Sequence, residues 1–108
     1  MSKINIKTSI KQNDKIQEEI ETKGILQDNK IKYVNDKIVT TLDINRQIIK
    51  RTSEDYKIEI NLKDELIKTE YLNIKIKLID KTIEQNKIQL KYKIIDTKDI
   101  FEYEIIWR

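Results

Sequence analysis

The sequence predicts an all-β protein: one domain over residues 1–108, folded as an up-and-down antiparallel β-barrel of eight to ten short strands. Three observations predict this class. Five segments alternate between apolar and polar residues, which is typical of half-buried antiparallel strands. Isoleucine, a strong strand former, supplies 24 of the 108 residues. With one Gly and no Pro, no linker divides the chain, and barrel closure would remove the edges at which such strands aggregate.

The alternating segments predict strands from the first residues to the last. They are Lys3–Ile10, Tyr56–Leu62, Leu72–Leu78, Ile88–Ile94 and Phe101–Trp107. Turns are expected at Asn13, Asp28–Asn29, Asn35–Asp36 and Ser53–Asp55, where Asn, Asp and Ser supply the usual turn chemistry. If the first hairpin turns around Asn13, Ile6 faces Ile20, Ile10 faces Ile16 and Lys7 faces Glu19.

The sequence of the last hairpin predicts which residues face each other across its two strands. With Thr97–Lys98 as the turn, Lys93 faces Glu102 and Lys91 faces Glu104. Tyr92 then faces Tyr103, Ile94 faces Phe101 and Ile88 faces Trp107 on the other side of the sheet. Opposite charges outside and apolar pairs inside are the expected cross-strand arrangement.

Two segments, 14–24 and 63–71, can be read as strand or helix. In the first, Asp14 would cap a helix, Ile16 and Ile20 have helical spacing, and Gly24 would end it. Between Ile79 and Lys87 the alternation changes parity, which predicts a β-bulge or a strand end.

Composition excludes several kinds of chemistry. The chain has no Cys and no His, so it offers no disulfide, thiolate nucleophile, imidazole base or Cys/His zinc site. One Gly cannot form a Gly-rich phosphate loop. We therefore expect no enzyme activity, and no catalytic, cofactor-binding or metal-binding residues.

Charge and hydropathy restrict the partners and the location. The 22 basic and 19 acidic residues interleave, so nucleic-acid binding is not expected. The longest apolar run, Ile105–Trp107, is far too short to cross a bilayer, and the first residues lack the apolar core of a signal peptide. We expect a cytoplasmic protein without a membrane association, encoded by an AT-rich bacterial genome. The oligomeric state is left open.

A family resemblance follows from the order of local features. An alternating first strand leads to Glu21-Thr22-Lys23-Gly24 and then to Lys32-Tyr33-Val34, while Thr69-Glu70-Tyr71-Leu72 precedes the later strands. This order resembles the YwiB-like family, a bacterial domain of unknown function. The resemblance implies a lipocalin-like β-barrel, and it implies neither a function nor catalytic residues.

A barrel interior offers a concave apolar site, so we expect a small hydrophobic or amphipathic ligand. The expected lining residues are Glu18, Tyr56, Tyr92, Phe101, Tyr103 and Trp107, all predicted to point inward. Glu18 is the unusual member because it interrupts an apolar face, across from Thr8. The same pattern also fits an aromatic core that fills the barrel. In that case the protein would be a protein–protein or RNA-associated interaction module that uses its outer lysines: Lys75, Lys77, Lys87, Lys91 and Lys93.

Overall fold

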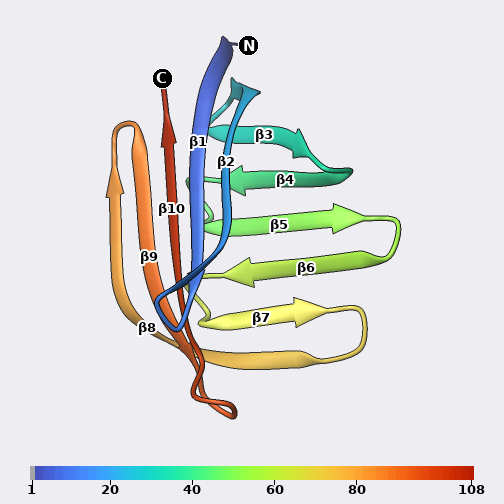
Figure 1. Cartoon of the computed structure of the whole chain (residues 1–108), viewed down its shortest axis with the longest axis vertical. Helices are drawn as coiled ribbons and strands as arrows, with labels where there is room; N and C mark the ends of the chain where they lie inside the picture. Colours follow the sequence, from blue (N-terminus) through green and yellow to red (C-terminus); the bar gives the residue numbers. More distant parts are fainter. Residues whose placement is uncertain (1) are drawn as a thin grey trace.

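The chain forms a closed β-barrel, shown in Figure 1. The computed structural model describes residues 2–108, and within them it contains ten strands and no helix. The strands are β1 (Ser2–Gln12), β2 (Lys15–Gln27), β3 (Lys30–Asn35), β4 (Ile38–Asp43), β5 (Ile48–Ser53), β6 (Tyr56–Asn61), β7 (Leu66–Thr69), β8 (Asn73–Glu84), β9 (Lys87–Ile94) and β10 (Ile100–Trp107). Each strand pairs antiparallel with its neighbours in sequence, and β1 pairs with β10 to close the sheet. The predicted all-β, up-and-down barrel is confirmed.

Strand lengths give the barrel its shape. The strands β1, β2 and β8 have 11 to 13 residues, whereas β3 to β7 have only four to six. The short strands cross the direction of β1 and β10 (Figure 1). Because β3 is short, it pairs with β2 only through Gly24–Gln27, and Lys15–Lys23 forms its ladder with β1 alone. Along Lys15–Lys23, β2 is therefore not paired with β3 on the side away from β1.

The turns explain how a barrel with one Gly can be so tightly connected. Both residues have positive φ at Asn13–Asp14, Asp28–Asn29 and Asp36–Lys37, the conformation of two-residue type I′ hairpin turns. Asn and Asp tolerate this left-handed region better than other non-Gly residues. The third turn lies one residue later than the predicted Asn35–Asp36.

Both ambiguous segments are β structure. Residues 14–24 lie largely in β2, and residues 63–71 form a turn followed by β7. Pairing with β1 and β6 overrides the local helical spacing, because the sheet satisfies the backbone groups along each strand. The predicted parity break is a bulge in β8: the register with β9 shifts between Leu78 and Asp80, and Ile79 is the extra residue.

The predicted register of the first hairpin is wrong. Ile6 pairs with Thr22 rather than Ile20, and Ile10 pairs with Glu18 rather than Ile16. The two-residue turn at Asn13–Asp14 and an extra residue, Gln17, in β2 shift the ladder. The salt bridge of Lys7 is accordingly made with Glu21, at 3.8 Å, instead of Glu19.

The predicted register of the last hairpin is also wrong, by two residues. Lys91 pairs with Glu102 at 3.3 Å, and Tyr103 faces Leu90 rather than Tyr92. The connection is longer than the predicted two-residue turn, because the backbone N–H of Ile94 donates to the carbonyl of Asp99 at 2.8 Å. A shift of two leaves each side chain on its predicted face.

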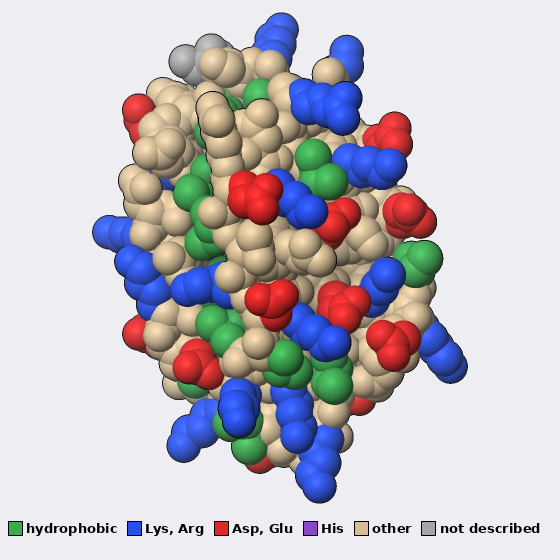
Figure 2. All heavy atoms as spheres, turned by 90° about the vertical axis from the view of Figure 1, so that its left-hand side faces the viewer, with side chains coloured by type: hydrophobic (Ala, Val, Ile, Leu, Met, Phe, Trp, Pro, Cys, Tyr) green, Lys and Arg blue, Asp and Glu red, His purple; other side chains and the backbone are tan. Residues whose placement is uncertain are grey.

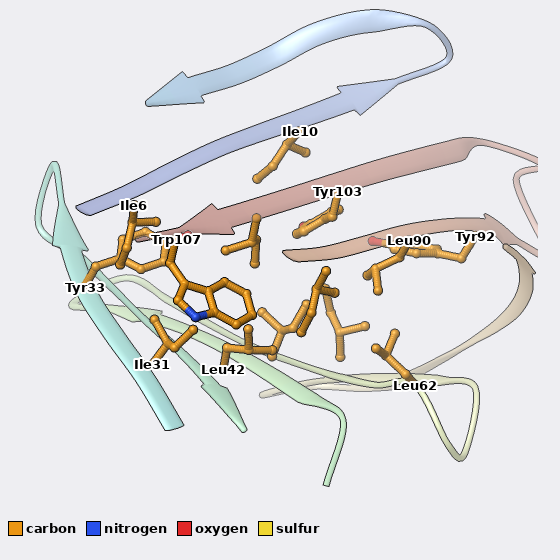
Figure 3. Packing of buried hydrophobic residues seen from close by; sticks show 14 of the residues in the cluster. Ile6, Ile10, Ile31, Tyr33, Leu42, Leu62, Leu90, Tyr92, Tyr103 and Trp107 are labelled. Atoms are coloured by element: carbon orange, nitrogen blue, oxygen red, sulfur yellow. The ribbon is translucent and has the colours of Figure 1, made fainter. Parts of the chain in front are cut away.

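One half of the barrel interior is solidly packed. We call it the packed half, and it consists of Ile6, Ile31, Leu42, Ile49, Ile60, Leu62, Ile88, Leu90, Ile105 and Trp107, each at most 4% exposed. Trp107 extends among Ile6, Ile31 and Leu42 (Figure 3). A side chain of this size fills space that the smaller surrounding side chains leave, as the close packing of a protein core requires.

Gly24 lies where β2 leaves β3. A Cβ at this position would stand 2.7 Å from the carbonyl oxygen of Lys32 and would collide with the side chain of Ile6. The chain needs glycine here because β1, β2 and β3 approach each other too closely for any side chain.

Candidate functional site

The other half of the barrel contains a cavity of about 670 Å³. Its apolar lining comes from Ile10, Ile20, Ile58, Ile67, Ile74, Ile94 and Phe101. Its polar lining comes from Gln12, Gln17, Glu18, Glu19, Asn35, Asp36, Arg51, Tyr56, Tyr92 and Tyr103. Several of these residues, including Gln17, Glu19 and Asp36, are exposed, so the cavity opens to solvent beside the β1–β2 and β3–β4 turns. We call this part of the interior the hollow half.

A salt bridge spans the inside of the hollow half. Arg51 of β5 donates from Nη2 to Oε2 of Glu18 in β2, at 2.8 Å. The side chains are 11% and 24% exposed, so both charges are largely removed from water. Each charge of such a pair compensates the other, and removal of either partner leaves a costly isolated charge.

The local backbone explains why each charge points inward. The bulge at Gln17 places Glu18 opposite Ile10, whose side chain is buried, so both side chains lie on the inner face. Arg51 lies two residues after the buried Ile49 and therefore shares its face of β5. The Nε of Arg51 is also buried, and it makes no hydrogen bond within residues 2–108.

The surroundings of Arg51 and of the three cavity tyrosines raise their pKa values. Burial lowers the pKa of Arg51, but the nearby Tyr103, Glu18 and Tyr56 outweigh it, so that the pKa is raised. Burial raises the pKa of Tyr103 and of Tyr56, although the Arg51 guanidinium opposes this effect in both. Burial likewise raises the pKa of Tyr92. At neutral pH the cavity therefore presents a guanidinium and neutral phenol groups.

Aromatic rings form one wall of the cavity. Tyr92 and Phe101 stack with centroids 5.5 Å apart and ring planes 18° from parallel. Tyr103 is also close to Tyr92, with centroids 6.1 Å apart and ring planes tilted by 37°. The close-up in Figure 3 shows Tyr92 at the other end of the cluster from Trp107, which belongs to the packed half.

The cavity contains most of the residues expected from the sequence. Five of the six line it: Glu18, Tyr56, Tyr92, Phe101 and Tyr103. Trp107 does not line it, and it packs at the opposite part of the interior with 4% exposure. Arg51 also lines the cavity and was not among the residues expected from the sequence. Two features of the sequence point to it: Arg51 lies two residues after Ile49, and it is one of only three arginines in a lysine-rich chain.

The outer lysines are partly neutralised. Lys87 and Lys91 make salt bridges with Glu104 and Glu102, whereas the other three have no salt-bridge partner within residues 2–108: Lys75, Lys77 and Lys93. Lys77 and Lys93 face each other directly across β8 and β9. On the face shown in Figure 2, basic and acidic side chains are intermixed and the hydrophobic ones form small separate groups.

Comparisons with known proteins give no match: no family model, no curated protein and no solved structure is similar to this chain. The resemblance to the YwiB-like family therefore stays a prediction. Across residues 2–108, no helix is long and apolar enough to span a membrane. The same residues bring together no group of three Asp or Glu side chains arranged to hold a metal ion.

Proposed function

We propose that this protein binds a small amphipathic molecule in the cavity of the hollow half. The volume of about 670 Å³ carries the proposal. Ligand sites typically measure about 300–1,000 Å³ and combine apolar walls with a few polar groups that orient the ligand. Here isoleucines and Phe101 supply the apolar walls, and Glu18 and Arg51 supply the polar groups.

Binding without catalysis fits the chemistry of the cavity. Inside the cavity the titratable groups are the Glu18–Arg51 salt bridge and tyrosines whose pKa values are raised by burial, while Glu19 and Asp36 lie exposed at its opening. Such groups orient a ligand by hydrogen bonds and charge, while a general base at neutral pH needs a group that readily exchanges a proton. We therefore propose a carrier or sensor of a small molecule rather than an enzyme.

A fluorescent probe tests the proposal. N-phenyl-1-naphthylamine is uncharged and brightens in apolar surroundings, so titration with the protein should give saturable binding with one site. Ile74→Trp fills the cavity from β8 and should weaken probe binding by about tenfold or more. Val34→Trp is the matched control, because Val34 is 54% exposed on the outside of β3, and it should bind like the wild type.

The two variants separate the competing functions. Equal binding by Ile74→Trp and by the wild type would place the probe outside the cavity and contradict the proposal. Absence of probe binding by the wild-type protein would instead favour an interaction module that uses Lys75, Lys77 and Lys93. Circular dichroism of both variants checks that each tryptophan leaves the barrel folded.

A further inference from the structure

We propose that the head group of the ligand is a cation, so that the cavity takes an organic amine or quaternary ammonium compound with an apolar tail. This inference rests on the ligand binding proposed above and specifies its chemical class. It follows from the charges that line the cavity, from their positions, and from the aromatic wall beside them.

The lining of the cavity is acidic although the protein is basic. The chain carries a net charge of +3. The charged residues that line the cavity are three carboxylates, Glu18, Glu19 and Asp36, and one guanidinium, Arg51. Lysines next to them in sequence, such as Lys37, are exposed and are not part of the lining. The cavity therefore has a negative balance of charge and attracts a cation entering from solvent.

The carboxylates lie at two depths. Glu19 and Asp36 are exposed at the opening, whereas Glu18 is inside and only 24% exposed. Arg51 occupies Oε2 of Glu18, which leaves Oε1 as an acceptor for a second cationic donor. An anionic head group would meet the opposite situation, because Glu18 already neutralises Arg51 and all other charges of the lining are negative.

The aromatic wall suits the same head group. Tyr56, Tyr92, Phe101 and Tyr103 all line the cavity. An ammonium group over the face of a Tyr or Phe ring gains a cation–π interaction, which strengthens when the contact is shielded from water. The isoleucines Ile58, Ile67 and Ile74 provide the apolar surface for a tail.

Three ligands with the same tail test the inference: decylamine, decanol and decanoate. Each is titrated by calorimetry near neutral pH and below the concentration at which it forms micelles. Decylamine should bind about tenfold more tightly than decanol, because its ammonium group gains about one desolvated cation–π contact. Decanoate should bind most weakly of the three. Added salt should reduce the advantage of the amine, because the exposed carboxylates at the opening are screened.

A matched pair of variants locates the charge effect. Asp36 and Asp28 each begin a type I′ turn, with φ of 51° and 52°, and Asn suits both positions equally. Asp36→Asn removes a charge from the lining and should reduce the preference for decylamine over decanol by about two- to threefold at low salt. Asp28→Asn removes a charge from the β2–β3 turn, which does not line the cavity, and should leave the preference unchanged.

The outcomes distinguish this inference from the proposed function. If decanol binds as tightly as decylamine, or decanoate binds more tightly than both, the cationic head group is wrong while ligand binding stands. Equal effects of Asp36→Asn and Asp28→Asn would also contradict it, because the preference would then follow overall charge. If none of the three compounds and no probe binds, the proposed function itself fails.

Discussion

The two halves of the barrel interior differ although the same sequence pattern encodes them. Ile58 and Ile60 lie two residues apart on one face of β6; Ile60 is 0% exposed in the packed half, while Ile58 is only partly buried and lines the cavity. In the packed half, Trp107 occupies the space between the strands. In the hollow half, Lys15–Lys23 of β2 has left β3, and the rings of Tyr92 and Phe101 stack against each other along the cavity wall. Alternation therefore encodes which side chains point inward, and it does not encode whether they fill the barrel.

The largest expected difference is between two alanine substitutions in β6. Ile60→Ala should lower the free energy of unfolding by about 2–5 kcal/mol, because it opens a cavity in a packed core. Ile58→Ala should cost about 1 kcal/mol, because the side chain already borders empty space and gives up less buried surface. Urea denaturation measures both. Equal losses would show that the two halves are packed alike.

A substitution at Gly24 tests how closely the strands pack where β2 leaves β3, at the border between the two halves. Gly24→Ala should cost about 1–3 kcal/mol, because the new Cβ would stand 2.7 Å from the carbonyl oxygen of Lys32 and force the strands apart. Lys23→Ala is the control at the neighbouring exposed position and should change stability by about 0.5 kcal/mol or less. A neutral Gly24→Ala variant would mean that β1, β2 and β3 can separate freely.

Alkaline pH should destabilise the aromatic wall of the hollow half. Burial raises the pKa of Tyr92 and Tyr103 above the ordinary value of 10.0, so the folded state keeps protons that the unfolded state loses. The associated stability is complete below pH 10 and is lost as the pH rises above it. Denaturation midpoints from pH 8 to 11 measure the decline. Tyr92→Phe should flatten it, whereas Tyr71→Phe, at a side chain 89% exposed, should not.

The smallest effect is expected on the outer face. Lys75 is exposed on β8 directly after the cavity residue Ile74, and Lys75→Ala should change the free energy of unfolding by about 0.5 kcal/mol or less. The same urea titration compares it with Ile76→Ala, which removes a side chain 2% exposed and should cost about 2–5 kcal/mol. Similar losses for the two variants would mean that inner and outer faces of β8 are wrongly assigned.

The sequence predicted the faces of the strands better than their registers. Parity alone placed Glu18, Tyr92 and Tyr103 inside, and the structure has them there. The register of the last hairpin was wrong by two residues, because a shift of two keeps every side chain on its face and leaves the alternating pattern unchanged. In the first hairpin the ladder is shifted by one residue beside the turn and by two beyond Gln17, so that Ile16, expected inside, is 59% exposed. The extra residue Gln17 carries no sequence signal of its own, since a bulge depends on the partner strand.

The cavity and its arginine were harder to predict. Arg51 lies in a short strand that begins with Ile48 and Ile49. Apolar residues therefore occupy both faces, and the sequence pattern does not show which face of the strand points inward. Strand tilt and the divergence of β2 from β3 set the volume that the inward side chains must fill. Strand tilt and this divergence are properties of the whole closed barrel, and no single segment of the sequence encodes them. For the same reason Trp107 was expected beside the ligand and is instead part of the packed half.

Methyl NMR of the isoleucines tests the central claim most directly, since these residues report on every region of the barrel. Titration with N-phenyl-1-naphthylamine should shift the methyl signals of Ile58, Ile74 and Ile94, which line the cavity. The signals of Ile31 and Ile49 in the packed half should stay in place, as should that of Ile16, which is 59% exposed on the outside. Shifts centred on Ile31 and Ile49, or confined to Ile16 and other outer residues, would contradict a barrel that is filled in one half and binds its ligand in the other.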